Sequence, residues 1–104
     1  MSNEGTKEGK GTMVYMDGSK YEGDWKKGLK DGFGVLTNAD GSVYKGGFKE
    51  DLMHGQGEIT DKKGIKIRAI WVNGKKHGDG LVFEADGKKK EVIFFNDLQF
   101  NLEK

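Results

Sequence analysis

Two histidines, His54 and His77, lie 23 residues apart, and each directly precedes a glycine. Imidazole nitrogens bind Zn²⁺, so histidines at equivalent places on successive units invite the hypothesis of a shared metal ion. Zinc sites take three or four ligands, however, and no cysteine or carboxylate cluster accompanies this pair in the sequence. We therefore interpret both histidines as turn residues set by their place in a repeated unit, and we expect no metal site.

Other residues that could bind phosphate or take part in catalysis also lack the neighbouring residues that such sites need. Gly32-Phe33-Gly34 and Gly78-Asp79-Gly80 resemble fragments of phosphate-binding loops, but the helix, lysine and hydroxyl residue that such loops need do not follow. Glu22 and Asp24 belong to a short alternating stretch where nothing would raise a carboxyl pKa for general acid catalysis. We expect no catalytic centre, no cofactor and no small-molecule substrate.

The elements that carry these residues repeat every 23 positions. Tyr21-Glu22-Gly23-Asp24-Trp25-Lys26-Lys27-Gly28 has counterparts at residues 44–51, 67–74 and 90–97. A frame of three glycines recurs with the same spacing, as Gly9, Gly11, Gly18, then Gly32, Gly34, Gly41, then Gly55, Gly57, Gly64, then Gly78, Gly80, Gly87. A fixed period of this length indicates a repeat array.

Within each unit the pattern alternates with a period of two, which predicts β-strands. Residues 21–26 and 32–37 form the first predicted pair, with a turn over 27–31. Asp40-Gly41 then predicts a tight turn before the next strand at Tyr44. The 18 glycines oppose helix formation. We expect an all-β protein whose eight or nine strands form a single-layer, twisted antiparallel meander that stays open, without substantial helix.

Tyr21-Glu22-Gly23-Asp24-Trp25, followed by Gly28, Gly32, Gly34 and Asp40-Gly41-Ser42, closely resembles the MORN repeat (membrane occupation and recognition nexus). The predicted organisation is a frayed tip (1–8), a half-repeat (9–20), units at 21–43, 44–66 and 67–89, a degenerate unit (90–95) and a C-terminal cap (96–104). Later units depart from the pattern, with Asp51 for Gly28, Ile67 for the tyrosine and Ala69 for the small glycine. A degenerate last unit is typical of a capping repeat.

The resemblance implies a non-enzymatic scaffold in a cytoskeletal, ciliary or membrane-apposed assembly, and a cytoplasmic location associated with the cytoskeleton or axoneme. The family name also implies an alternative, binding to phosphoinositide or other anionic membranes. Lys62-Lys63, Lys75-Lys76-His77 and Lys88-Lys89-Lys90 would serve that alternative if they lined one edge. The Met1 start and the degenerate last unit favour a complete small protein over a piece of a larger enzyme.

Alternate side chains of a strand share a face, so stacked units place one row of aromatic residues above another. The first row is Trp25, Phe48, Trp71 and Phe94; the second is Tyr21, Tyr44 and Ile67; Gly23, Gly46 and Ala69 lie between them. We predict that these rings form the core. A groove for a partner peptide, lined by Tyr21, Trp25, Tyr44, Phe48 and Trp71, is the alternative.

The opposite face changes from charged to apolar along the chain, and we expect the N-terminal half to be apolar on one face only. We predict a partner-binding surface in the C-terminal half, formed by Ile70, Val72, Leu81, Phe83, Ile93, Phe95, Leu98 and Phe100. Either Leu98, Phe100 and Leu102 fold back over this surface, or a protein partner or second copy covers it. In the second case we expect strand addition or a homodimer through the C-terminal end.

The composition excludes several other classes. Only 34% of residues are hydrophobic, and the net charge of +1 provides no basic footprint for nucleic acid. Cysteine is absent, which fits a reducing compartment. No apolar run approaches the roughly 20 residues of a transmembrane helix. We therefore expect a soluble, intracellular protein that does not bind nucleic acid.

Overall fold

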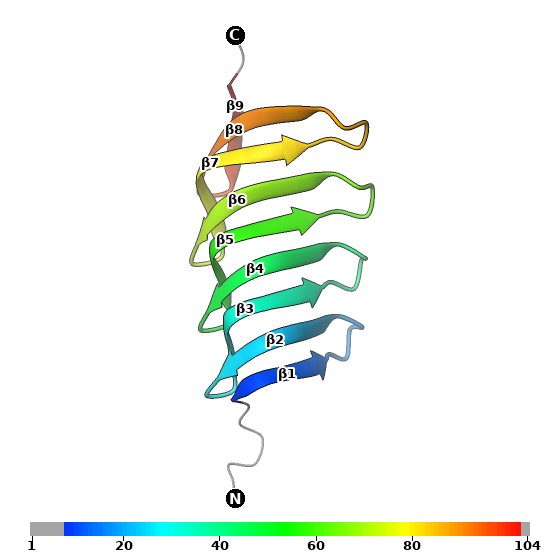
Figure 1. The fold of residues 1–104 in the computed structure, drawn as a ribbon, viewed down its shortest axis with the longest axis vertical. Helices are drawn as coiled ribbons and strands as arrows, with labels where there is room; N and C mark the ends of the chain where they lie inside the picture. Colours follow the sequence, from blue (N-terminus) through cyan, green and yellow to red (C-terminus); the bar gives the residue numbers. More distant parts are fainter. Residues whose placement is uncertain (1–7, 103–104) are drawn as a thin grey trace, which may run out of the picture.

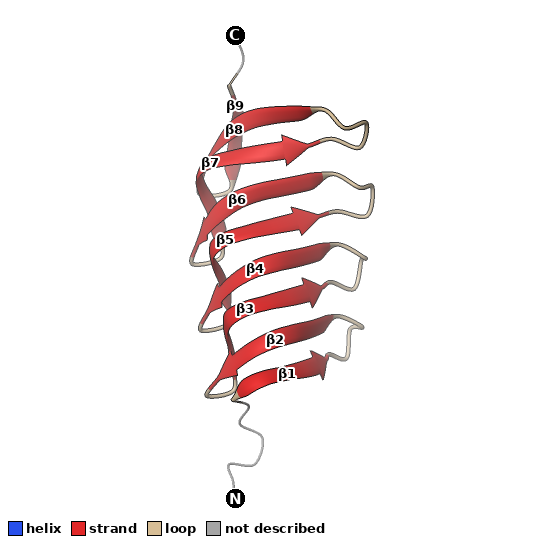
Figure 2. Ribbon diagram, viewed as in Figure 1, coloured by secondary structure: helices blue, strands red, loops and turns tan. Residues whose placement is uncertain are grey.

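The computed structural model describes residues 8–102, which form one open antiparallel sheet with its strands in chain order (Figure 1). The strands are β1 (Gly9–Val14), β2 (Lys20–Lys26), β3 (Leu29–Thr37), β4 (Val43–Lys49), β5 (Leu52–Thr60), β6 (Lys66–Val72), β7 (Lys75–Phe83), β8 (Lys89–Phe95) and β9 (Leu98–Asn101). Figure 2 shows strands joined by short loops and no helix in the described part. The predicted single-layer meander is confirmed.

Short turns join β2 to β3, β4 to β5, β6 to β7 and β8 to β9, at the left of Figure 1. Each has two central residues with positive φ, such as Lys27 (53°) and Gly28 (81°), which is the type I′ geometry that suits the twist of hairpins. The predicted turn over 27–31 was therefore too long, because the chain returns to strand geometry at Leu29.

The turns at the other end of the hairpins are longer, and aspartates stabilise them. In the first, the Asp17 carboxylate accepts hydrogen bonds from the Ser19 amide (2.9 Å) and hydroxyl (2.6 Å). Asp40 and Ser42 repeat this arrangement one unit later. The Ser19 hydroxyl and amide lower the pKa of Asp17. A turn lies at Asp40-Gly41 as predicted, but it spans residues 38–42 and is longer than the short turns.

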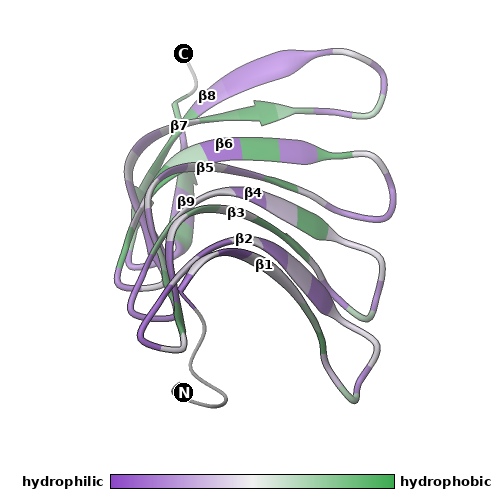
Figure 3. Cartoon of the chain, turned by 60° about the horizontal axis from the view of Figure 1, so that its bottom comes forward, coloured by the Kyte–Doolittle hydropathy of each residue, from purple (hydrophilic) through white to green (hydrophobic). Residues whose placement is uncertain are grey.

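A bulge bends every second strand. Gly23 pairs with Gly34 and Trp25 pairs with Lys30, so the single residue Asp24 faces three residues of β3. Gly32, in the middle of those three, has a φ of +112°. The same irregularity recurs between β4 and β5 and between β6 and β7. Bulges bend strands and increase their twist, and Figure 3 shows the resulting arch.

The arch closes toward the aromatic face. Lys30 pairs with Trp25 near one end of β2, whereas Tyr15 lies beyond the other end, roughly 20 Å away along a straight strand. The Lys30 Nζ nevertheless lies 3.5 Å from the Tyr15 Oη, and 5.6 Å from the centre of the Tyr21 ring. Such contacts require the strand to bend over the rings, which is how a single sheet encloses a core.

The predicted aromatic rows form that core. Tyr21 and Tyr44 are fully buried, and Trp71 is 2% exposed. Ring centres lie 5.0 Å apart in the Tyr21–Trp25 pair and 5.1 Å apart in the Tyr21–Phe48 pair, both in edge-to-face geometry. Such pairs add stability beyond the area they bury. The rings therefore link successive units as well as filling each one.

Candidate interaction surface

The side of the sheet opposite the buried rings, here called the second face, carries the predicted partner-binding residues. In β6, Ile70 and Val72 alternate with buried residues and point to this face. On β8 and β9 the register groups four apolar residues, because Ile93 pairs with Phe100 and Phe95 pairs with Leu98. Between this group and β6, strand β7 places His77 opposite Ile70 and Lys75 opposite Val72. We call the set Ile70, Val72, Leu81, Phe83, Ile93, Phe95, Leu98 and Phe100 the C-terminal apolar patch.

Most of this patch is open to solvent. The exposed fraction is 45% for Val72, 58% for Phe95 and 61% for Leu98, whereas Leu81 and Phe83 are half-buried. The pairs Ile93–Phe100 and Phe95–Leu98 place large apolar side chains next to one another at such exposure, which is a mark of an interaction surface.

The C-terminal segment does not cover the patch. β9 lies beside β8 in the same sheet, with Val92 opposite Asn101 and Phe95 opposite Leu98. The Leu102 amide continues this pairing by donating to the Glu91 carbonyl oxygen (3.3 Å). Leu98 and Phe100 therefore enlarge the patch, instead of folding over it as the self-capping alternative required.

Three apolar residues of the N-terminal half also lie on the second face and were missed from the sequence. Leu29 is 37% exposed, Leu52 is 47% exposed and Phe33 is 59% exposed. Leu29 and Leu52 pair with Lys26 and Lys49 just after the short turns. The expectation that this half is apolar on one face only was wrong. Leu29 and Leu52 were missed because the extra strand residues at each bulge were not foreseen, whereas Phe33 lay within the predicted strand 32–37 and its outward position was overlooked. The recurrence of leucine at 29, 52 and 98 was the available signal.

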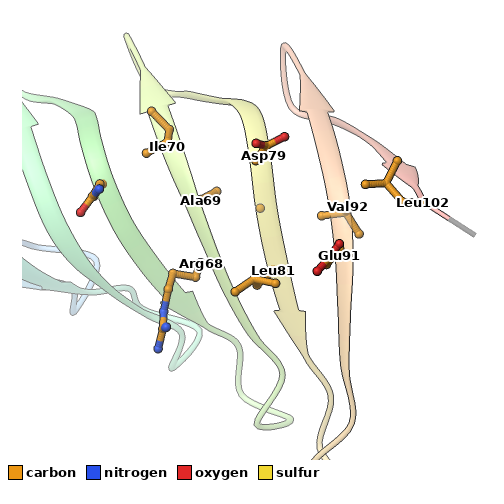
Figure 4. Close-up of a pocket in the computed structure, with 10 residues that line it drawn as sticks. Arg68, Ala69, Ile70, Asp79, Leu81, Glu91, Val92 and Leu102 are labelled. Atoms are coloured by element: carbon orange, nitrogen blue, oxygen red, sulfur yellow. The ribbon is translucent and has the colours of Figure 1, made fainter.

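A hollow of about 520 Å³ lies on the second face within the C-terminal half (Figure 4). It is lined by Gln56, Arg68, Ala69, Ile70, Asp79, Gly80, Leu81, Glu91, Val92 and Leu102. Figure 4 shows Ile70 near Asp79 and Leu81 near Glu91. The Arg68 guanidinium lies 3.2 Å from the Glu58 carboxylate and 5.0 Å from the Phe83 ring centre, so its charge is already engaged.

The predicted groove aromatics are all buried on the other side of the sheet. Tyr21, Trp25, Tyr44, Phe48 and Trp71 are between 0% and 6% exposed. The Tyr21 and Tyr44 hydroxyls donate to the carbonyl oxygens of Asp24 and Gly47, each at 2.9 Å. Burial raises the pKa of both tyrosines to about 12. These rings thus leave no free face for a partner, and we assign them to the core.

A sequence match accompanies these structural features, which are strands carrying Tyr, Gly and Trp at alternate positions, paired glycines, and an open, bent sheet. The family model described as MORN repeat matches residues 3–20, 21–43, 44–66 and 69–81. The chain belongs to the MORN repeat family. MORN repeats occur in protein-binding and membrane-associated proteins, and the family is generally non-enzymatic. No curated protein matches the chain.

The two histidines of the MORN units lie in strands β5 and β7, not in turns as predicted. The His54 Nδ1 accepts a hydrogen bond from the Asn73 amide (3.3 Å) in the neighbouring short turn. Asp31 accepts from Glu50 in the same way one unit earlier (3.2 Å). His77 instead packs against Phe95, with ring centres 5.5 Å apart. Among the described residues, no three metal-binding side chains gather.

The three lysine clusters of the MORN array do not all lie at the same end of the strands. Lys62 and Lys63 lie in the turn between β5 and β6, and Lys88 to Lys90 lie beside the next turn of the same series. Lys75 and Lys76 begin β7, next to a short turn at the opposite end of the strands (Figure 1). A continuous basic edge, as the membrane alternative required, is therefore not formed. The described residues also contain no helix long and apolar enough to span a bilayer.

Proposed function

We propose that this MORN protein is a non-enzymatic scaffold that binds another protein through the second face of its sheet. The observation that carries the proposal is the exposed C-terminal apolar patch, with Phe95 and Phe100 at 58% and 54% exposure on strands fixed by hydrogen bonding. A rigid array exposes such residues at fixed spacing, so a partner does not have to order them on binding.

The open edge of β9 supports a specific mode of association. β9 pairs with β8 on one side only, which leaves backbone N–H and C=O groups available on the other. Exposed edges accept further strands unless charge or a bulge protects them. The side chains of Leu98 and Phe100 offer no such charge. We propose that a partner strand, or the same strand of a second copy, adds here and extends the patch into a homodimer or complex.

The wider setting of the proposal follows from the family. MORN repeats in protein-binding and membrane-associated proteins support a role as a subunit of a cytoskeletal, ciliary or membrane-apposed assembly. We propose a cytoplasmic location associated with the cytoskeleton or axoneme, with protein partners and without nucleic acid or a small-molecule substrate.

Matched substitutions at one repeat position test the proposal. Residues 26, 49, 72 and 95 are equivalent, and all four are exposed on the second face. Val72→Asp with Phe95→Asp places negative charge in the patch, whereas Lys26→Asp with Lys49→Asp introduces the same side chain at the equivalent positions outside it. Purification of tagged chains from the native source should recover a partner with wild type and with Lys26→Asp, Lys49→Asp. The partner should be lost with Val72→Asp, Phe95→Asp. Equal recovery with all three chains would contradict the proposal.

Vesicle co-sedimentation tests the membrane alternative. Vesicles with phosphoinositide and phosphatidylserine at physiological salt should leave the chain in the supernatant, because its lysines are divided between opposite ends of the strands. Sedimentation with these vesicles, but not with neutral ones, would favour the membrane role over the scaffold.

A further inference from the structure

The hollow on the second face combines an apolar wall with negative charge. Ile70, Leu81 and Leu102 supply apolar side chains, while Ala69 and Val92 are buried beneath the surface. Asp79 and Glu91 are exposed at its margin (Figure 4). The volume of about 520 Å³ lies within the range of sites that take a small ligand or a few side chains. An occupant can therefore bury an apolar group there while meeting two carboxylates.

These two carboxylates differ from most others in residues 8–102. Nearly every described carboxylate has a hydrogen bond or ion pair, as in Asp24 with Lys10 (2.7 Å) and Glu84 with Lys90 (3.0 Å). Within this range, the carboxylates of Glu50, Asp79 and Glu91 form neither, although the Glu50 amide donates to Asp31. Two of the three line the hollow, and its single arginine is held by Glu58. The hollow thus presents uncompensated negative charge.

The register fixes how these charges are placed. Asp79 pairs with Ile93 and Leu81 pairs with Glu91, so Asp79 and Glu91 occupy diagonal positions on β7 and β8. Diagonal neighbours on one face of a sheet lie roughly 7–8 Å apart. Two cationic side chains of one short peptide can therefore meet both carboxylates at once.

We propose that the hollow binds a peptide segment of a partner protein that carries one bulky aliphatic or aromatic side chain with lysines or arginines close beside it. The apolar side chain packs against Ile70, Leu81 and Leu102, and the basic side chains pair with Asp79 and Glu91. This inference rests on the proposed scaffold function and specifies the chemistry of the partner. The same charges oppose anionic lipid headgroups at this place.

Selection from a random peptide library displayed on phage tests the inference, with the full chain as bait. Wild type should enrich peptides that combine Leu, Ile or Phe with neighbouring Lys or Arg. Asp79→Asn with Glu91→Gln keeps the size of both side chains and removes the charge. Because partly exposed ion pairs contribute modestly, this variant should bind the selected peptides roughly 3- to 30-fold more weakly in fluorescence anisotropy.

Three further measurements test the charge dependence and the place of binding. Glu50→Gln neutralises the third carboxylate without a partner, which lies in a turn outside the hollow, and should leave the affinity unchanged. The affinity of wild type for the selected peptides should fall with added salt, whereas that of Asp79→Asn with Glu91→Gln should barely change. In NMR titrations, the amides of residues 69–70, 80–81 and 91–92 should shift.

Enriched peptides without basic residues, an unchanged affinity of the double variant, or the absence of any enriched peptide would overturn the inference. The proposed scaffold function is judged separately. If a native partner is lost from Val72→Asp with Phe95→Asp but is retained by Asp79→Asn with Glu91→Gln, the scaffold proposal stands and the basic-peptide inference fails.

Discussion

The phenol ring of Tyr21 lies over the backbone of Gly34 in the neighbouring strand, where a Cβ would overlap the ring. Tyr44 covers Gly57 in the same way one unit later. In the Gly-x-Gly segments of β3, β5 and β7, the two glycines thus have separate roles. The first, as in Gly32, adopts the positive φ of the bulge, and the second makes room for a ring. A sheet bent over flat-lying rings can form a core from few apolar residues.

This contact predicts a measurable coupling between Tyr21 and Gly34. Gly34→Ala should destabilise the protein by about 1–3 kcal/mol, because the added methyl group must displace the ring. In a Tyr21→Ile background the same alanine should cost much less, since the three atoms nearest to that methyl group belong to Tyr21. Urea unfolding of both single variants and the double variant measures the coupling energy. Additive changes in the free energy of unfolding would show that the Tyr21 ring does not restrict the size of residue 34.

Alkaline pH should destabilise the protein through its buried tyrosines. Burial raises the pKa of Tyr21 and Tyr44 from 10.0 to about 12. Below pH 10 both phenols are protonated in the folded and unfolded states, so their contribution is fully present. As the pH rises from 10 to 12, the unfolded chain releases these protons first and stability falls, by about 2 kcal/mol for each ring.

Thermal unfolding across this pH range, together with the ultraviolet absorbance of tyrosinate, checks the prediction. Tyr44→Phe removes one of the two ionising groups and should reduce the alkaline loss by about half. It also removes the hydrogen bond to the Gly47 carbonyl, which should cost about 1 kcal/mol at neutral pH. An alkaline profile identical to that of wild type would exclude Tyr44 as a source of the effect.

Burial predicts unequal costs for removing aromatic rings from the two faces. Trp71→Ala removes a ring that is 2% exposed and in edge-to-face contact with Tyr44, and should cost about 3–5 kcal/mol. Phe33→Ala removes a ring that is 59% exposed on the second face and should cost below about 1 kcal/mol. Denaturant midpoints give the comparison, and similar costs would contradict the assignment of the core to one face.

The unpaired edge of β9 predicts that self-association, where present, depends on this strand. In sedimentation velocity over a concentration series, wild type should shift from monomer to dimer. Leu98→Lys with Phe100→Lys should remain monomeric, because charge protects the edge and removes apolar contact. Lys10→Ala, near the other edge, is the control and should dimerise as wild type does. A wild-type chain that stays monomeric at all concentrations would leave a heterologous partner as the sole use of this edge.

His54 should act as a hydrogen-bond acceptor and not as a metal ligand. His54→Ala leaves the Asn73 amide without its partner and should cost about 0.5–1.5 kcal/mol. His54→Asp should recover part of this loss, because Asp31 accepts the equivalent bond in the preceding unit. Zn²⁺ should leave the melting temperature of wild type unchanged. A zinc-dependent increase that disappears in His54→Ala would restore the metal hypothesis.

The fold could be predicted from the sequence because its decisive interactions are local. The period of 23 residues, the alternation around Tyr21 and Trp25, and the Asp40-Gly41 turn determine strands, pairing order and core. The bulges could not be predicted in this way. A leucine at position 29 indicates neither that the strand begins there nor that Asp24 will face three residues across the ladder. For the same reason Leu29 and Leu52 were missed, and the histidines were placed in turns.

The candidate surface was predicted in outline and corrected in detail. The departures at Ile70, Val72, Ile93 and Phe95 indicated an apolar second face. All four residues lie on that face, with Lys75, His77 and Asp79 of β7 between the first pair and the second. Whether the last strand covered them depended on the β8–β9 register, and the pairing of Phe95 with Leu98 shows that it does not. The unpaired state of Asp79 and Glu91 likewise depends on which cations lie nearby, and sequence spacing alone does not determine this.

By itself, the sequence determined that this protein is a MORN-type array with a repeated aromatic core. In a hairpin array each strand pairs with the next strand in the chain. Residues 23 positions apart therefore occupy equivalent places in successive hairpins. The tertiary structure alone decided that the sheet bends toward Tyr21 and its equivalents, that β9 extends the sheet, and that a hollow forms beside Ile70 and Leu81. These features arise from bulges and from contacts between units, where side chains of different repeats meet.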